Sequence, residues 1–242
     1  MDTVPLADPA ALRDLVAANR ILAHEGVLDA FGHVSMRHPE RADQYVIARS
    51  VGPELVTEAD LQLFALDGAQ VGGMQGTAYT ERFIHGAIYE ARPDVLAVCH
   101  NHAPSIIPFT VTKAPLRPIY HMAALLGGEV PRWDIATEFG DATDLLVRNM
   151  EHGRSLVRAL GTRRVVLMRG HGSAVAGRSL QEIVWACVYM NENARLQMQA
   201  MALGDVQYLS AGEIATMEDY QIDPRGTERA WHAWRKRVGM AD

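Results

Sequence analysis

The sequence predicts an α/β fold of three layers, in which helices cover a largely antiparallel or mixed sheet. The chain of 242 residues lies within the range of one large domain, and 48% apolar residues are enough for a sizeable core. Segments with helical and with strand periodicity mix throughout the sequence, without a regular strand-helix-strand alternation. We find no internal repeat and no low-complexity linker. We therefore expect one domain over residues 1–242, with a helical tail over about 206–242.

The first elements are a helix and two short strands. Residues 8–29 open with Asp8, a residue type that caps helix N-termini, and with Pro9, which suits the first helical position. Apolar residues then recur at helical spacing, which indicates a helix. Residues 31–39 (FGHVSMRHP) and 44–50 (QYVIARS) are typical of two strands joined by a polar loop.

The next segments add strands and a second helix. Residues 61–73 (LQLFALDGAQVGG) predict a strand that runs into a glycine turn. In residues 79–94 (YTERFIHGAIYEARPD), Thr80 is the expected helix cap and Pro93 the expected stop. Residues 95–104 (VLAVCHNHAP) form an apolar run of strand length that ends at two histidines.

The second half of the chain also contains both predicted helices and predicted strands. Residues 141–161 predict an amphipathic helix that ends in a glycine, and residues 163–177 predict a buried strand, a glycine loop and another strand. A long helix with a wide apolar face is expected over residues 179–204. Residues 219–240 predict one last helix.

Composition excludes several classes of protein. The net charge of −6, without a basic stripe, argues against nucleic-acid binding. No run of 18 apolar residues predicts a membrane span, and the first residues lack the pattern of a secretory signal. Neither Cys99 nor Cys187 belongs to a Cys-x-x-Cys pair, which excludes thiolate zinc and redox motifs. We expect a cytoplasmic protein in a reducing compartment.

Three histidines are candidate metal ligands. His100 and His102 lie two apart at the end of an apolar run, so a strand would present both imidazoles to one side. One ion at about 2.0–2.1 Å from each nitrogen could then use both. His171 follows a second buried strand, between glycines that leave room beside the backbone. Ordinary loop histidines would give the same pattern, and each of the three taken alone favours that alternative.

Glu81 adds a carboxylate to the candidate site. It lies in the first turn of the helix predicted over residues 79–94, with His85 one turn further on the same face. The helix dipole favours a negative charge in that turn. Glu81 is thus a metal ligand, a general acid/base or simply a capping glutamate, and spacing alone slightly favours the capping glutamate.

Together these segments resemble the class II aldolase/adducin family. The matching stretches are FGHVSMR, TERFIHGAIY, CHNHAP and RGHGSAVAG, in that order, within a resemblance that covers about residues 10–205. The resemblance implies a three-layer α/β/α fold around a mainly antiparallel sheet. It implies a divalent metal ion, zinc or manganese, on His100, His102 and His171, and a proton-transfer role for Glu81, which in the absence of substrate can also sit on the metal. It also implies a homotetramer with active sites near subunit contacts.

Departures from the sugar-phosphate members of that family bear on the substrate. Those members have Gly-Asn-x-Ser in the first motif and two serines before the acidic residue, whereas here His33 replaces the asparagine, and Tyr79 and Thr80 replace the serines. A phosphate site needs small residues and exposed N–H donors, which a phenol and a lone hydroxyl do not supply. Some aldolases use a tyrosine from a neighbouring subunit as proton donor. Here Tyr120 lies one residue out of register and His121 takes the place.

The Gly-His-x-Ser form and the stretch IARSVGPELVT are more similar to decarboxylase-type members, including those that act on hydroxylated aromatic or pyridine dicarboxylates. Arg49 could hold a substrate carboxylate through its forked N–H donors, although an exposed strand-end arginine is an equally good interpretation. The candidate substrate-binding residues are His33, Ser35, Arg49, Ser50 and Thr80. The candidate catalytic residues are Glu81, Tyr120 and His121.

The sequence therefore predicts a metal-dependent carbon–carbon lyase. We expect a decarboxylase of a small hydroxylated aromatic or other hydroxy or keto carboxylate, working through a metal-stabilised enolate-type intermediate. The first alternative is a class II retro-aldolase acting on a hydroxy-carbonyl or sugar-phosphate substrate. The second alternative is a metal-free interaction module like the adducin head, which predicts loss of the metal ligands, whereas all are present here.

Overall fold

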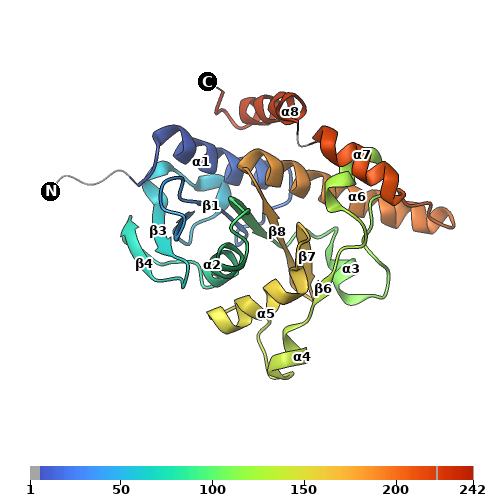
Figure 1. Cartoon of the computed structure of the whole chain (residues 1–242), viewed down its shortest axis with the longest axis horizontal. Coiled ribbons are helices and arrows are strands. Elements are labelled where there is room, and N and C mark those ends of the chain that lie inside the picture. The colour runs from blue at the N-terminus through green and yellow to red at the C-terminus, as the bar shows by residue number, and fades with distance from the viewer. Residues whose placement is uncertain (1–5, 222, 242) are drawn as a thin grey trace.

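A single sheet organises the molecule. The computed structural model describes residues 6–221 and 223–241. Within that part of the chain, eight strands form one sheet in the order β4-β3-β2-β1-β5-β8-β7-β6, with helices packed against it (Figure 1). All neighbouring strands are antiparallel except β6 and β7, which are parallel. The predicted α/β fold with a mainly antiparallel sheet is confirmed.

Every strand predicted from the sequence is present. There are two differences. Residues 61–73 form a hairpin of two strands around the glycine turn rather than one strand that ends there, and the two-residue strand Arg132–Trp133 was not predicted. The strands are β1 (His33–Arg37), β2 (Gln44–Ala48), β3 (Leu61–Ala65), β4 (Gln70–Gly73), β5 (Ala97–Asn101), β6 (Arg132–Trp133), β7 (Val165–Met168) and β8 (Gly172–Gly177).

Strand β5 lies in the middle of the sheet and carries the first metal-ligand candidate. His100 is opposite His33 on β1 and opposite Ala174 on β8. Because side chains alternate along a strand, Cys99 and His100 point to opposite faces. The Cys99 thiol contacts Cys187 on one face, and His100 meets Glu81 on the other. The central position buries His100 completely, with 0% of its surface exposed.

Two pairs of long helices cover the sheet. Helices α1 and α6 pack together on one face, and α2 and α5 pack together on the other (Figure 1). The predicted cap of α1 is present, since Asp8 accepts from the Ala11 N–H. The structure adds a cap for α6, where Ser179 accepts from the Glu182 N–H. The α-helices are α1 (Pro9–His24), α2 (Arg82–Ala91), α3 (Ile107–Val111), α4 (Ile135–Phe139), α5 (Met150–Leu160), α6 (Leu180–Leu203), α7 (Ala211–Gln221) and α8 (Pro224–Arg237). The 3₁₀ helices are η1 (Pro53–Leu55), η2 (Glu58–Asp60) and η3 (His121–Leu126).

The helix predicted over residues 141–161 is shorter than expected. It begins at Met150, because the Asn149 side chain accepts from the His152 N–H at 2.9 Å and so caps a new N-terminus. Before that point, Thr143 Oγ1 accepts from the Leu145 N–H. Such local side-chain bonds compete with helical ones, so residues 141–149 form a loop.

Two further helix boundaries differ from the sequence prediction. Thr80 is not the cap of α2, because Glu81 occupies the N-cap position and its side chain caps no helical N–H. The tail contains two helices rather than one over residues 219–240. The break falls before Pro224, whose ring disfavours a helical conformation in Asp223.

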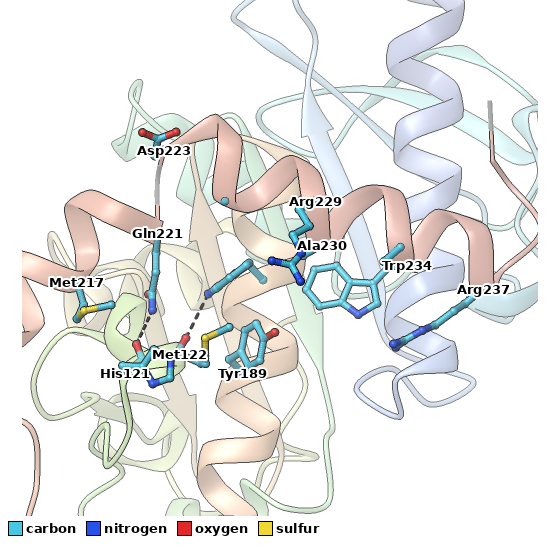
Figure 2. A pocket seen from close by; sticks show the side chains of 13 residues that line it. His121, Met122, Tyr189, Met217, Gln221, Asp223, Arg229, Ala230, Trp234 and Arg237 are labelled. Carbon is cyan, nitrogen blue, oxygen red and sulfur yellow. Dashed lines mark hydrogen bonds between the residues drawn. The ribbon is translucent and has the colours of Figure 1, made fainter.

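The two last helices pack against η3 and α6 around a cavity of about 850 Å³ (Figure 2). Gln221 accepts from the Leu125 N–H and donates to the His121 carbonyl, which ties α7 to η3. The Trp185 indole N–H donates to the Met122 carbonyl at 3.2 Å. None of the described helices is both long enough and apolar enough to cross a bilayer.

Candidate metal centre

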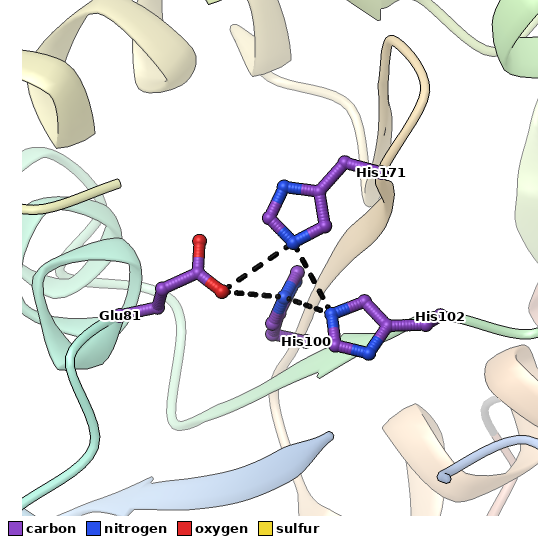
Figure 3. A group of neighbouring side chains, drawn as sticks. All are labelled: Glu81, His100, His102 and His171. Atoms are coloured by element: carbon purple, nitrogen blue, oxygen red, sulfur yellow. Dashed lines mark hydrogen bonds and ion pairs between the residues drawn. The ribbon is translucent and has the colours of Figure 1, made fainter. Parts of the chain in front are cut away.

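Four side chains from three separate segments converge at the C-terminal end of β5, on the face of the sheet that α2 covers (Figure 3). His100 comes from β5, His102 from just beyond it, His171 from the turn between β7 and β8, and Glu81 from the N-terminus of α2. One ligand atom from each lies within 4.8 Å of the others. The structure thus brings together all four residues that the sequence predicted as metal ligands.

Each imidazole turns the same nitrogen toward the centre. His100 Nδ1 lies 3.0 Å from the Ser173 carbonyl oxygen and His171 Nδ1 lies 2.9 Å from the Leu145 carbonyl oxygen. His102 Nδ1 lies 3.1 Å from the Asp29 carboxylate. These oxygens only accept, so each Nδ1 carries the hydrogen and each neutral ring leaves Nε2 bare. Three lone pairs facing one another are the arrangement that a cation stabilises.

The distances between ligand atoms fit a first-row divalent ion. The Nε2 atoms of His100 and His102 are 2.9 Å apart, and those of His102 and His171 are 3.2 Å apart. Glu81 Oε2 lies 3.3 Å from His100 Nε2 and 3.4 Å from His171 Nε2. Ligands at about 2.0–2.1 Å from one ion are separated by roughly 2.9 Å at a right angle and by roughly 3.4 Å at a tetrahedral angle. The residues present therefore fit a metal ion, and three imidazoles with a carboxylate suit zinc or manganese.

The two oxygens of Glu81 have different partners. Oε1 accepts from the Val147 N–H at 2.9 Å, while Oε2 faces the histidines. Burial of Glu81 favours its neutral form, but His100 and His171, when their rings are protonated, outweigh it and lower the pKa of the carboxyl group. Conversely, burial opposes protonation of His171, yet the Glu81 carboxylate raises the pKa of that ring. Glu81 is thus held as a carboxylate.

Asp29 supports the centre from behind His102. Its carboxylate accepts from His102 Nδ1 and from the backbone N–H groups of Phe31 and Gly32, each of the latter at 2.9 Å. A carboxylate behind a metal-binding histidine fixes the orientation of the ring and raises its basicity. Sequence reasoning missed Asp29, because nothing in the spacing links it to a histidine 73 residues away.

The loop before α5 holds two ligands at once. The Leu145 carbonyl accepts from His171, and the Val147 N–H donates to Glu81. Leu145 has a φ of 67°, the only positive φ among the described residues other than glycine. That conformation is strained for a leucine, and such strain persists where the surrounding structure imposes it.

The glycines around His171 have two different roles. Gly170 has a φ of 62°, which a glycine adopts without strain, and it lines the cavity beside the centre. Gly172 faces the neighbouring strand, where an added Cβ would lie 2.0 Å from the Asn101 carbonyl oxygen. The prediction that both glycines leave room for a ligand is therefore wrong for Gly172, whose small size permits a close approach of β8 to β5.

A cavity of about 420 Å³ opens beside the metal ligands, a volume within the range of small-molecule sites. Phe31 stands at its rim with 73% of its surface exposed. The lining residues include aromatic and apolar side chains next to the ligands. They are Phe31, His33, Ser50, Tyr79, Thr80, Glu81, His102, Asp144, Leu145, Leu146, Gly170 and His171.

Three of the predicted substrate-binding residues, His33, Ser50 and Thr80, line this cavity. Ser35 does not: it is fully buried and hydrogen bonds to His85 and Tyr89. Arg49 Nε pairs with the Asp60 carboxylate at 2.8 Å, and Arg49 is not among the residues that line the cavity.

The predicted proton donors lie elsewhere in the chain. His121 lines the cavity between η3, α6, α7 and α8, and does not line the one beside the metal centre. Tyr120 is next to it, with its ring 6.1 Å from that of His121. The Tyr120 hydroxyl is buried and has no hydrogen-bond partner among the residues that the structure describes. Within one chain, neither group reaches the metal ligands, so a role for them requires another copy.

Comparison with known proteins identifies the family of this chain. The profile of the "Class II Aldolase and Adducin N-terminal domain" matches residues 13–198. The chain belongs to the class II aldolase/adducin family. A solved relative in fold is an aldolase II superfamily protein from Pseudomonas syringae, with a TM-score of 0.80 and 24% identity, covering 98% of this chain and 95% of the other.

Members of the family that resemble this chain in sequence include both decarboxylases and aldolases. The decarboxylase tropJ of Talaromyces stipitatus is 36% identical, with 94% of this chain and 93% of that protein covered. A 3,4-dihydroxyphthalate decarboxylase of Arthrobacter keyseri is 30% identical, over 98% and 97%. An L-fuculose phosphate aldolase of Escherichia coli is 28% identical, over 77% and 81%. These likenesses support a lyase, and the prediction of the family is confirmed.

Proposed function

We propose that this member of the class II aldolase/adducin family is a divalent-metal-dependent decarboxylase of a small hydroxylated aromatic carboxylate. The observation that carries the proposal is the convergence of three bare imidazole nitrogens and one carboxylate oxygen beside a cavity. His100, His102, His171 and Glu81 would hold the ion. When bound, a divalent ion supplies Lewis-acid stabilisation of the negative charge left on oxygen as the carbon–carbon bond breaks.

The cavity walls support an aromatic substrate. Phe31, Tyr79, Leu145 and Leu146 offer apolar and aromatic surface beside the ligands. Such walls favour a planar hydroxyarene ring, whose hydroxyl and carboxylate oxygens would face the histidines. Apolar surface of this kind also excludes water from the reacting carbon.

The charges around the cavity disfavour a phosphorylated substrate. Among the described residues that line it, none is a lysine or an arginine, and Asp144 and Glu81 are acidic. Recognition of a phosphate group depends on such cations or on several exposed N–H donors. The retro-aldolase remains the second candidate because of the aldolase relatives, and this cavity favours the decarboxylase over it. The ligand set disfavours a metal-free interaction module.

Proton transfer is assigned to Glu81, which as a carboxylate would take the proton of a substrate hydroxyl and return it to the carbon that loses carbon dioxide. Tyr120 or His121 of another copy is the alternative donor. Glu81 lines the cavity as a carboxylate that two histidines and the Val147 N–H hold in place. The alternative requires the predicted homotetramer. The tetramer, the single-domain organisation over residues 1–242, the cytoplasmic location and the choice between zinc and manganese are proposals that rest on the sequence and the family.

Product analysis tests the function. Protein loaded with zinc or with manganese is mixed with a panel of hydroxylated benzoates and phthalates, and with hydroxy-carbonyl sugar phosphates. We expect release of carbon dioxide without an aldehyde from an aromatic acid. An aldehyde from a sugar phosphate, with no carbon dioxide from any acid, would favour the aldolase instead.

Two variants test the roles of the ligands. His100→Ala should lose the bound metal and all activity, because it removes a fully buried ligand. Glu81→Gln should retain residual activity, since general acid–base assistance contributes about 10²–10⁴-fold. Metal content is measured in parallel, and a Glu81→Gln protein as active as the wild type would exclude Glu81 from proton transfer.

A further inference from the structure

A buried chain of hydrogen bonds leads from the cavity wall into the interior. His33 Nδ1 lies 2.7 Å from His85 Nε2, and His85 Nδ1 lies 2.6 Å from Ser35 Oγ. Ser35 Oγ in turn lies 2.8 Å from the Tyr89 hydroxyl. All four residues are at most 2% exposed. Of the four, only His33 lines the cavity beside the metal ligands, so the chain has one end at the candidate active site.

The inner end of the chain fixes the direction of its hydrogen bonds. The Tyr89 phenol is buried at the inner end of the chain, and among the described residues the side-chain partner of its hydroxyl is Ser35 Oγ. The Tyr89 O–H needs an acceptor, and Ser35 Oγ is the one that the described residues offer. A buried hydroxyl without an acceptor loses the hydrogen bond that water would give it, which is strongly unfavourable. Tyr89 therefore donates to Ser35.

The directions of the remaining hydrogen bonds follow, because each group has one hydrogen to donate. The Ser35 O–H donates to His85 Nδ1, so a neutral His85 carries its hydrogen on Nε2 and donates it to His33 Nδ1. A neutral His33 must then carry its own hydrogen on Nε2. That nitrogen has no hydrogen-bond partner among the described residues, and the ring lies between those of Tyr79 and His100, at 4.3 Å and 5.2 Å.

We propose that His33 offers an Nε2–H donor to the cavity, and that Tyr89, Ser35 and His85 are positioning residues that hold His33 in that tautomer. The donor would bind the substrate oxygen on which negative charge develops as the carbon–carbon bond breaks. His33 keeps its hydrogen throughout, so the step needs no further reactant. This inference rests on the proposed function, and it adds a fixed donor that selects substrates with an acceptor oxygen next to the breaking bond.

Two substitutions of His33 test the donor. The glutamine amide nitrogen occupies the position of histidine Nε2, whereas the shorter asparagine reaches only that of Nδ1. We expect His33→Gln to stay within about tenfold of the wild-type kcat. We expect His33→Asn to lose about 10²–10³ in kcat, the effect of removing one donor to a developing oxyanion. KM and metal content should change little. Equal activities in the two variants would contradict the proposal.

The tautomer itself is measured by ¹⁵N NMR of histidine-labelled, zinc-loaded protein, with the His33 signals assigned by their loss in His33→Gln. We expect hydrogen on His33 Nε2 and none on Nδ1. Tyr89→Phe keeps the ring but removes the O–H that sets the direction, so it should give a mixture of tautomers and a lower kcat at unchanged KM. Ala87→Gly, on the same helix, is the control and should change neither the tautomer nor kcat.

The two proposals fail in different ways. Hydrogen on His33 Nδ1 in the wild type would overturn this inference and leave the decarboxylase proposal intact. The expected tautomer, without carbon dioxide release from any hydroxylated aromatic acid, would overturn the proposed function and with it the role of the donor.

Discussion

The orientation of the metal ligands is set residue by residue, through the atoms behind the imidazoles. Each ring would bind equally well through either nitrogen, and the choice of Nε2 comes from acceptors at Nδ1. Two of these acceptors are backbone carbonyls, of Ser173 and Leu145, and the third is the Asp29 carboxylate. The sequence indicated which residues are candidate metal ligands but not which of their atoms face the centre, because a carbonyl group carries no signature in the side-chain pattern.

The support from Asp29 gives the first prediction. Asp29→Asn keeps an oxygen that accepts from His102 but removes its charge, so the ring becomes a weaker ligand. We expect metal affinity to fall about 10–100-fold. Competition with a chromophoric chelator measures it. Asp94→Asn is the control, because Asp94 forms an exposed ion pair with Arg92, and it should leave affinity unchanged. An Asp29→Asn protein that binds metal like the wild type would show that Asp29 does not support the centre.

Among the elements, the loop before α5 departs most from the sequence prediction and matters most to the site. Its amphipathic pattern is compatible with a helix. However, Asn149 caps α5, so the helix begins only after it, and the backbone of the preceding loop faces the candidate ligands. Leu145 O and Val147 N, which hold His171 and Glu81, are groups that a helix would have used internally. The local sequence pattern could not reveal this loop, since the loop is stabilised by contacts with segments that are distant in the sequence.

Strain at Leu145 gives the second prediction. A β-branched side chain fits a positive φ worse than leucine does, so Leu145→Val should lower the free energy of unfolding by about 1–2 kcal/mol. It should also weaken metal binding, because the Leu145 carbonyl would shift away from His171. Leu146→Val makes the same change one residue along, where φ is negative, and should lose less. Urea unfolding and metal titration measure both effects, and equal losses in the two variants would exclude a special role for the conformation.

The turn between β2 and β3 gives a third prediction, on pH dependence. The Thr57 hydroxyl, the Thr57 N–H and Arg49 all donate to the Asp60 carboxylate, and together they lower its pKa against the opposing effect of burial. A carboxyl group whose pKa is lower in the folded state stabilises the fold above its unfolded pKa of about 3.9. That contribution is lost as pH falls through the folded pKa. Asp60→Asn should therefore be less stable than the wild type at pH 7, by about 1–3 kcal/mol.

The difference between Asp60→Asn and the wild type should shrink as pH falls below about 4, where the carboxyl group takes up its proton in the unfolded state before it does so in the folded state. Urea unfolding at pH 7 and at steps down to pH 3 measures it, with a chelator present so that metal binding does not contribute. Asp141→Asn, at an exposed position, is the control. A difference that stays constant over this range would contradict the assignment to Asp60.

At the scale of the whole molecule, the sequence predicted the centre of the fold better than its periphery. Strands such as β5 and β8 are short apolar runs with clear ends, and four motifs in a fixed order specified the family. The two-residue strand β6 depends on its parallel partner β7 and has no pattern of its own. The two-helix tail depends on contacts of α7 with η3, such as those of Gln221, which lie 96 and 100 residues apart in the chain.

Because the four ligands come from α2, β5 and the turn between β7 and β8, the metal should tie these segments together and stabilise the whole fold. A ligand that binds only the folded state adds about 4 kcal/mol at a free concentration 1,000 times its Kd. For a chain of this length, 1 kcal/mol shifts Tm by roughly 2–4 °C. Saturating zinc should therefore raise Tm by about 8–16 °C over chelator-treated protein, and His100→Ala should abolish the rise. Thermal unfolding followed by circular dichroism measures it. A wild-type Tm indifferent to zinc, or an equal rise in His100→Ala, would mean that the three imidazoles do not share one ion.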